Sequence, residues 1–152
     1  MPPKTHLLRF KIMSYVLIPD EKHGCVLLTC EGSIMLAEAT TAWREVQGLM
    51  AAMQWKRVLV DVTALRTNLD TEELFDLAKL LWRDFPQGGR MALVVRWDQS
   101  RLAKLLETLV RSVGMYLTVF LDEEPAGAWM WGETQDQQQV EEFAQGELCA
   151  IN

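Results

Sequence analysis

The chain has 152 residues, 49% hydrophobic and 24% charged, with a formal net charge of -6 and a pI near 4.9. This composition is typical of one globular domain, and its acidic balance disfavours nucleic acid or an anionic membrane surface as a partner. The first residues contain no apolar leader core and no stretch approaches the ~20 apolar residues of a membrane span, so we expect a cytoplasmic protein.

Two strands are predicted first, at residues 12–18 and 25–30, and the turn-forming sequence at 19–24 between them has hairpin length. We expect these strands to pair antiparallel. Ser33 is a plausible N-cap for the helix that follows, which runs to about Gln54. Its buried face is predicted from apolar residues spaced three and four apart: Met35, Ala39, Ala42, Val46, Leu49 and Met53.

The apolar run at residues 57–62, broken only by Asp61, predicts a central parallel strand covered by helices on both faces. A polar loop at 63–71 joins it to a second helix, and Asp70 with Glu73 fits a capping box at the helix start. The apolar stripe of this helix is predicted at Leu74, Leu77, Ala78, Leu81 and Phe85. Open α/β folds place their working groups at such a strand-to-helix loop.

A further strand is predicted at 91–95, a third helix from Ser100 to a C-terminal cap at Gly114, and a last strand at 116–121. A short helix opens at 122–125, and the tail at 134–152 is rich in glutamine and glutamate. The inward residues of the last two helices are predicted to be Leu102, Leu105, Leu106, Leu109, Val113, Ala128, Trp129 and Met130.

This order of elements predicts an α/β layered fold with a mixed, mostly parallel sheet of about five strands, an N-terminal hairpin and four or five helices. Neither a repeat nor a linker divides the chain. We therefore expect a single domain over residues 1–152, with its core at about 12–132 and a polar tail at 133–152. A homodimer is the default expectation for a small protein of this kind.

Three sequence patterns carry a resemblance to a known family. They are Arg-Val-Leu-Val-Asp-Val at 57–62, Gly-Arg-Met-Ala-Leu-Val-Val at 89–95, and Val-Phe-Leu-Asp-Glu-Glu at 119–124 leading to Ala-Trp-Met at 128–130. On these, the region 15–132 resembles the small bacterial branch of the STAS, or SpoIIAA-like, family, which is related to anti-sigma-factor antagonists. The resemblance implies a SpoIIAA-like fold and a regulatory protein partner.

In those antagonists, an Asp-Ser-Ser-Gly motif carries a serine whose phosphorylation switches partner binding off. The matching sequence here is Asp-Thr-Glu-Glu at 70–73, which places Thr71 at the phosphorylated position and Asp70 at the aspartate. Glu72 and Glu73 replace the second serine and the glycine, and they would repel a phosphate that the helix N-terminus would partly stabilise. Thr71 is therefore either a regulatory hydroxyl or an ordinary first-turn residue beside its cap.

Other polar residues near the strand ends allow two interpretations each. Asp61 is either a functional buried carboxylate or an acceptor for the loop that follows it. Arg66 and Arg96 either hold an anion or pair with neighbouring carboxylates. The candidate regulatory or partner loop consists of Asp61, Thr63, Arg66, Asp70 and Thr71.

Six tryptophans are many for this length, and exposed aromatic residues are enriched at interfaces. Trp82, beside the stripe of its helix, and Trp97, just after a strand, are expected to be partly exposed. If they cluster with Met50 or Met53, they form a partner surface or the mouth of an apolar pocket.

Catalytic and metal-binding patterns are missing from the sequence. Cys25, Cys30 and Cys149 form no Cys-x-x-Cys pair, and Cys25 and Cys30 should face opposite sides of one strand. His6 and His23 stand far from any nucleophile and are expected at the surface. Because a Gly-rich phosphate cradle is also missing, we expect neither a metal nor a cofactor.

These observations favour a non-enzymatic module that binds a protein partner through the 63–71 loop, the start of the second helix and the Trp97 edge. A carrier of a small apolar or lipid-like ligand is the alternative, because the fold resembles lipid-transfer domains and the chain is rich in Met and Trp. An enzyme is the third hypothesis and would need four aspartates to converge at the strand ends: Asp61, Asp70, Asp98 and Asp122.

Overall fold

The structure is a computed structural model that describes residues 13–66 and 69–132. Its sheet contains five strands, and the helices α2 to α5 and one 3₁₀ turn, η1, complete the described part. In chain order the elements are β1 (Ser14–Asp20), β2 (Cys25–Ser33), α2 (Leu36–Met53), β3 (Arg57–Arg66), α3 (Thr71–Trp82), β4 (Arg90–Val94), η1 (Trp97–Gln99), α4 (Ser100–Arg111), β5 (Tyr116–Phe120) and α5 (Glu123–Trp131).

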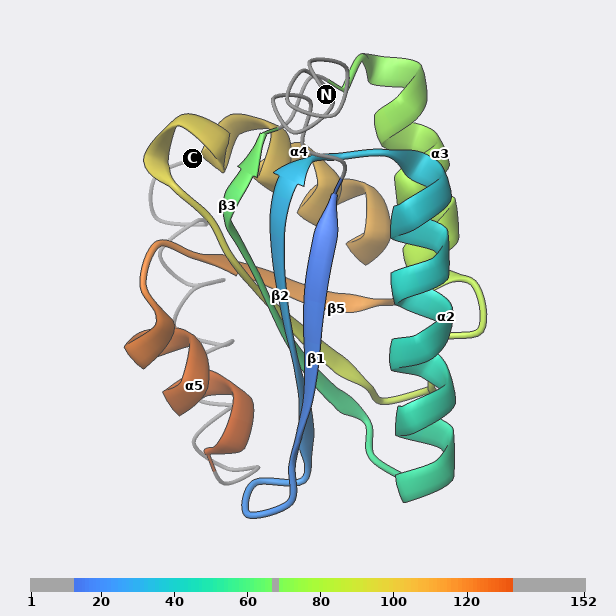
Figure 1. Ribbon diagram of the computed structural model, residues 1–152, viewed down its shortest axis with the longest axis vertical. Helices are drawn as coiled ribbons and strands as arrows, with labels where there is room; N and C mark the ends of the chain where they lie inside the picture. The colour runs from blue at the N-terminus through green and yellow to red at the C-terminus, as the bar shows by residue number, and fades with distance from the viewer. Residues whose placement is uncertain (1–12, 67–68, 133–152) are drawn as a thin grey trace, which may run out of the picture.

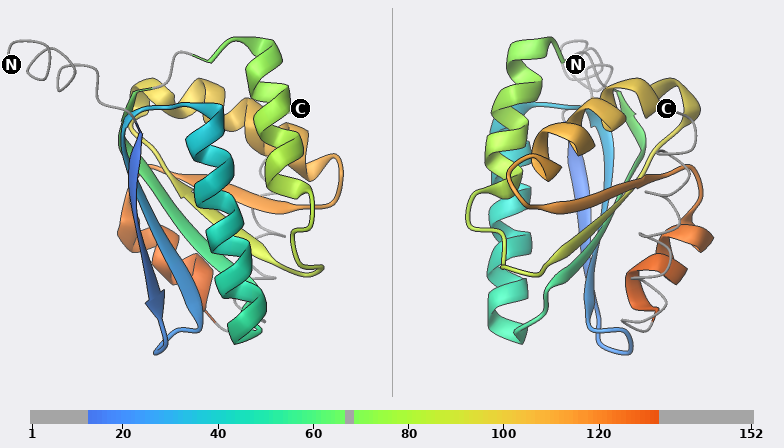
Figure 2. Two further views of the ribbon diagram at one scale, coloured as in Figure 1. Left: turned by 45° about the vertical axis from the view of Figure 1, so that its right-hand side comes forward. Right: turned by 180° about the vertical axis from the view of Figure 1, so that it is seen from behind.

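The strands lie in the order β1-β2-β3-β4-β5, with β1 antiparallel to β2 and every later pair parallel. Each parallel crossover therefore moves one strand further in the same direction. Because such crossovers are right-handed, they place α2, α3 and α4 on one face of the sheet. The opposite face is left to α5, as Figures 1 and 2 show. The predicted α/β layers, hairpin and mixed five-stranded sheet are confirmed.

Alternate residues of β3 divide the core into two layers. Val58 and Val60 belong to the larger layer under α2, α3 and α4, whereas Leu59 belongs to a smaller layer with Trp129 and Met130 of α5. This alternation follows from the period of two residues in a strand. The prediction that this strand is covered on both faces is confirmed.

The strands β2 and β3 both run further than the sequence indicated. Residues 63–66, which were predicted as a loop, continue β3. Ser33, which was predicted as an N-cap, is the last residue of β2 and pairs with Arg66. The extension is stabilised by Leu65, which is only 2% exposed. The first helix therefore begins at Leu36, with Met35 in extended conformation at the N-cap.

The start of α3 confirms the predicted capping box. The Asp70 carboxylate accepts a hydrogen bond from the Glu73 backbone N–H at 2.8 Å, and the Asp70 N–H donates to the Glu73 carboxylate at 3.2 Å. The helix ends at Trp82, earlier than predicted, because Arg83 adopts an extended conformation with ψ 126°, and Asp84 after it has a left-handed φ of 61°. Phe85 still reaches the core, where its ring stacks on Trp43 at 5.9 Å.

The start of α4 differs from the prediction. The 3₁₀ turn η1 precedes it, so Ser100 is the first helical residue rather than the N-cap, and its Oγ donates to the Trp97 carbonyl at 2.6 Å. The predicted inward residues Leu105 and Val113 are exposed. Leu106 is buried as predicted, and the other buried residues of this helix are Ala103 and Val110.

The helix α5 begins after Asp122 as predicted, and it buries Trp129 and Met130 against the sheet, whereas Ala128 is exposed. His6, Cys149, residue 12 of the first predicted strand and the tail at 133–152 lie outside the described residues. The extent of the domain over 1–152 therefore stays a prediction.

Candidate functional site

The polar groups of the sheet gather where the parallel strands end. The register between β2 and β3 shifts just after the pair of Thr29 and Asp61, and the Asp61 carboxylate bonds to a residue two positions further along its own strand. Its Oδ1 accepts hydrogen bonds from the Thr63 N–H at 2.9 Å and from the Thr63 hydroxyl at 2.6 Å. This confirms the interpretation of Asp61 as an acceptor for residues that follow it, although Thr63 is a strand residue.

The carboxyl group of Asp61 also forms a hydrogen bond with Glu123, the first residue of α5. Burial opposes ionisation of Asp61, but the hydrogen bonds with Glu123 and Thr63 hold the pKa of Asp61 below its ordinary value. The same contact, together with desolvation and the negative charge of Asp61, raises the pKa of Glu123. The two carboxyl groups therefore influence each other's titration, and their contact links β3 to α5.

Replacing Asp61 by asparagine is expected to lower the pKa of Glu123 towards that of an ordinary glutamate. The substitution removes the neighbouring negative charge while it keeps an acceptor oxygen for Thr63. An NMR titration that follows the carboxyl carbon of Glu123 measures the change. Glu124→Gln, one residue further along α5, is the control, and an unchanged Glu123 pKa in Asp61→Asn would contradict the pairing.

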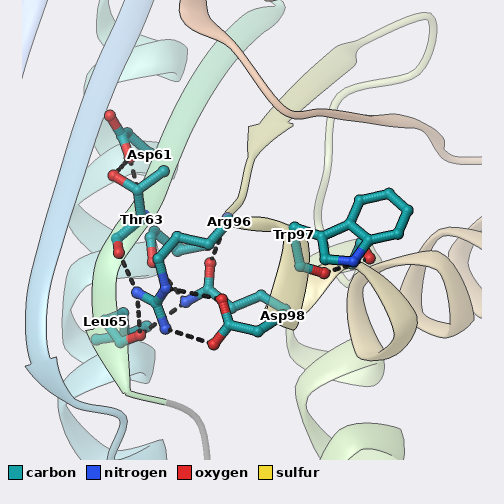
Figure 3. Close-up of polar contacts among 9 residues, drawn as sticks. Asp61, Thr63, Leu65, Arg96, Trp97 and Asp98 are labelled. Carbon is teal, nitrogen blue, oxygen red and sulfur yellow. Dashed lines mark hydrogen bonds and ion pairs between the residues drawn. The ribbon is translucent and has the colours of Figure 1, made fainter.

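A clasp formed by Arg96, Asp98 and Gln99 holds the end of β3. Figure 3 shows Arg96 and Asp98 beside Thr63 and Leu65. Pairing between β3 and β4 ends at Asp61 and Val94, whereas β3 continues to Arg66, so its later carbonyls need other donors. Arg96 supplies two hydrogen bonds from its guanidinium, to the carbonyls of Thr63 and Leu65.

The guanidinium of Arg96 also pairs with Asp98. Its Nε and Nη2 donate to the two carboxylate oxygens of Asp98 at 3.0 and 3.2 Å. The hydrogen bond from Arg96 lowers the pKa of Asp98. The sequence allowed Arg96 either to hold an anion or to pair with a neighbouring carboxylate. Its guanidinium is bound to Asp98 and to the two carbonyls, so the second interpretation is confirmed.

Gln99 completes the clasp and is only 4% exposed. Its Nε2 donates to the carbonyls of Val62 at 2.9 Å and Leu65 at 2.7 Å, and its Oε1 accepts from the Arg96 N–H at 2.8 Å. Each polar atom of the buried amide is therefore used, and the loop after β4 is fixed to the end of β3.

The indole of Trp97 stands at the tip of this clasp, 79% exposed, and Figure 3 shows it pointing away from the Arg96 guanidinium. Trp82 is also exposed, at 43%, which confirms the expectation for both. The two lie at opposite ends of the sheet, because α3 runs back from the carboxyl ends of the strands to the start of β4. Trp97 therefore does not cluster with Met50 or Met53, which end α2.

The remaining loop candidates lie at the same edge as Trp97. Asp70 caps α3, and Thr71 is its exposed first residue. Arg66 is exposed at the end of β3, where its carbonyl accepts a hydrogen bond from the Ile34 N–H at 3.0 Å. Phosphorylation at Thr71 and anion binding at Arg66 stay predictions.

An apolar cavity of about 110 Å³ lies between the sheet and helices α2, α3 and α4. Most of its lining is aliphatic, and its few polar contributors include the Cys30 thiol, the Gln99 amide and the Trp43 indole. The Trp43 side chain is 3% exposed, and its Nε1 has no hydrogen-bond partner among residues 13–66 and 69–132.

The cysteines and the histidine within the described residues are the other candidates for reactive or metal-binding groups. Cys25 and Cys30 lie in opposite core layers as predicted, and burial raises the pKa of each thiol to about 11. His23, expected at the surface, is half-buried between Asp20 at 2.8 Å and the ring of Trp131 at 4.2 Å. Within the described ranges, no three His, Cys, Asp or Glu residues could hold a metal ion, and no helix could span a membrane.

Three of these residues have roles that the sequence does not predict. Gln99 lies in a polar stretch, Glu123 belongs to an acidic helix start, and Trp43 lies outside the apolar stripe predicted for its helix. A signal was available only for Trp43, which lies four residues after Ala39 and three before Val46 on the buried face of α2.

Several solved structures are similar to this chain in fold, among them the following two. An anti-sigma factor antagonist from Mycobacterium paratuberculosis matches with a TM-score of 0.55 and 12% sequence identity, over 78% of this chain and 94% of that one. An uncharacterized DUF3478-family protein with a SpoIIAA-like fold from Shewanella loihica PV-4 matches with a TM-score of 0.51 and 15% sequence identity. The match covers 78% of this chain and 93% of that one.

No protein-family model matches the chain, and no curated protein matches it in sequence. At these identities the likeness concerns the fold. The protein therefore belongs to the class of α/β proteins with a SpoIIAA-like fold, which confirms the resemblance recognised in the sequence at the level of architecture.

Proposed function

We propose that this protein is a non-enzymatic module that binds a protein partner through the edge at which the parallel strands end. The observation that carries the proposal is Trp97, an indole that is 79% exposed at the tip of a hydrogen-bonded clasp. Exposed tryptophans are the residues most enriched among binding hot spots, and a fixed backbone lowers the entropy lost on binding.

The surroundings of Trp97 support this proposal. Arg66, Asp70 and Thr71 are exposed at the same edge. The solved anti-sigma factor antagonist of similar fold is by its description a protein that acts on another protein. If the partner covers this edge from η1 to the start of α3, a phosphate on Thr71 would add charge to the interface.

Replacing Trp97 by alanine is expected to weaken partner binding at least tenfold, because truncating an aromatic hot spot costs about 2 kcal/mol or more. The partner would first be identified by cross-linking and mass spectrometry in native lysate. Its affinity for the purified full chain would then be measured by calorimetry, together with the melting temperature of each variant.

Trp82→Ala is the matched control, since it removes the same side chain from an exposed position at the other end of the sheet. It should leave the affinity within about twofold. The proposal fails if both variants bind as the native chain does, or if both weaken binding equally.

The second candidate function is a carrier of a small apolar ligand, and the cavity of about 110 Å³ favours it. An apolar cavity of about 150 Å³ can stay dry and bind benzene, so this one suits a molecule of one small ring. Organic extraction of protein purified from its native host, followed by mass spectrometry, tests this candidate. It fails if nothing co-purifies and no apolar probe raises the melting temperature.

A further inference from the structure

The face of the sheet that carries α5 is apolar beyond the area that this helix covers. Val16 and Ile18 of β1 are 58% and 49% exposed. Ile18 pairs with Leu27 of β2, which packs into the smaller core layer beside α5, so Ile18 and Val16 point to the same face. Because α5 packs against β3, β4 and β5, none of the described helices covers this β1–β2 strip of Val16, Ile18 and Leu27. The solvated face of an antiparallel pair is usually polar, so the strip is suited to a partner.

The chain leaves α5 next to this strip. The ring of Trp131, the last residue of α5, stacks on His23 in the turn between β1 and β2, with ring centroids 4.2 Å apart. Gly127 makes room for the indole, since a Cβ at this position would lie 2.3 Å from the Trp131 ring. Figure 1 shows the end of α5 beside the turn. The residues after Gly132 therefore start at the foot of β1 and β2.

The sequence from 133 to 152 has the length and the pattern to cover the strip. A linker at 133–139 spans about 23 Å when extended, which is as long as the seven-residue β1. Apolar residues then recur at intervals of three and four, as on one side of a helix, and the positions between them are mostly glutamate and glutamine. These apolar residues are Val140, Phe143, Ala144, Leu148 and Ile151.

We propose that residues 140–151 dock as an amphipathic helix on the β1–β2 strip, beside α5. The apolar residues of the segment cover Val16 and Ile18, and its glutamates and glutamines face water. A short tether favours this occupant over a free partner, because it holds the segment at an effective concentration of about millimolar. The smaller core layer then lies under two helices, and the Trp97 edge at the other end of the sheet stays open for a protein partner.

A cysteine within the segment provides the probe for a test on the full chain. Cys149 lies off the apolar side of the predicted helix, whereas Cys25 and Cys30 are buried, and burial raises the pKa of each of these two thiols to about 11. A thiol-reactive nitroxide therefore labels Cys149 in the folded protein. If the segment docks, the nitroxide broadens the amide NMR signals of Val16 and Ile18, and reduction of the nitroxide restores them.

Phe143→Asp is the variant that should release the segment. It replaces the largest apolar side chain of the segment by a charge, so we expect the ratio of docked to undocked segments to fall about tenfold or more. The broadening at Val16 and Ile18 is then lost. Gln145→Asp adds the same charge on the polar side of the helix and should keep the broadening. Both positions lie outside the sheet and its packed helices, so the fold is kept in either variant.

The outcomes decide between this segment and a second copy of the chain. No broadening at Val16 and Ile18 in the native sequence, or equal broadening in Phe143→Asp and Gln145→Asp, overturns the docking. A mixture of isotope-labelled Cys149→Ser protein with nitroxide-labelled protein of natural isotope content reports contacts between copies. Broadening in this mixture assigns the strip to a second copy and also overturns the proposal, whereas broadening only within the nitroxide-labelled chain supports it.

Discussion

Gln99→Leu is expected to lower the free energy of unfolding by about 2–3 kcal/mol. Leucine has a similar size but leaves the carbonyls of Val62 and Leu65 and the backbone N–H of Arg96 without the bonds that the amide makes. Each buried polar group left unpaired costs about 1–3 kcal/mol, and relaxation of the loop recovers part of the sum. Chemical unfolding in urea measures the loss.

The neighbouring Asp98→Ala is the control for this experiment. This substitution removes the ion pair between Asp98 and Arg96. The Asp98 side chain is 70% exposed, and exposed ion pairs contribute about 1 kcal/mol or less. A Gln99→Leu variant as stable as Asp98→Ala would show that the clasp does not depend on the buried amide.

Leu65→Ala is expected to destabilise the protein by about 3 kcal/mol, within the range of about 2–5 kcal/mol that is usual for buried leucine truncations. Leu65 is 2% exposed and lies in the stretch of β3 that extends past β4. The loss would include the apolar contacts of the side chain and an enlargement of the neighbouring cavity.

Leu105→Ala makes the same chemical change at a position on α4 that is 42% exposed. It should cost less than about 1 kcal/mol, since little buried surface is lost. The sequence alone predicts the opposite order, because it places Leu105 inward and Leu65 in a loop. Equal destabilisation by the two variants in urea unfolding would contradict the structure.

Local chemistry explains which elements the sequence could predict. The capping box at Asp70 is encoded within four residues, and the buried run around Val60 needs only its own pattern. The crossovers then follow from the handedness of βαβ units, which is general. The architecture was therefore predictable from short-range signals.

Residues whose roles depend on distant partners were not predictable. Ser33 resembles an N-cap, but it becomes a strand residue because β3 extends far enough to pair with it. Gln99 has no local signal, since the carbonyls that it satisfies lie more than thirty residues away in the chain. The Asp61–Glu123 pair likewise requires α5 to pack against β3, a contact that neither segment encodes alone.

The exposure of Trp97 was predicted, whereas the fixed backbone that carries it was not. The indole stands on η1, which is held by the Arg96 and Gln99 hydrogen bonds. A tryptophan on a mobile loop would lose more entropy on binding than one on a fixed turn. The clasp is therefore what makes this edge suitable for recognition.

Photo-crosslinking from position 97 tests the proposed protein-binding edge most directly. A photoreactive phenylalanine analogue would replace Trp97 in one variant and Trp82 in another, each expressed as the full chain in its native host. The account predicts a discrete crosslinked protein from position 97 and none from position 82. No crosslink from position 97, or the same products from both positions, would contradict it.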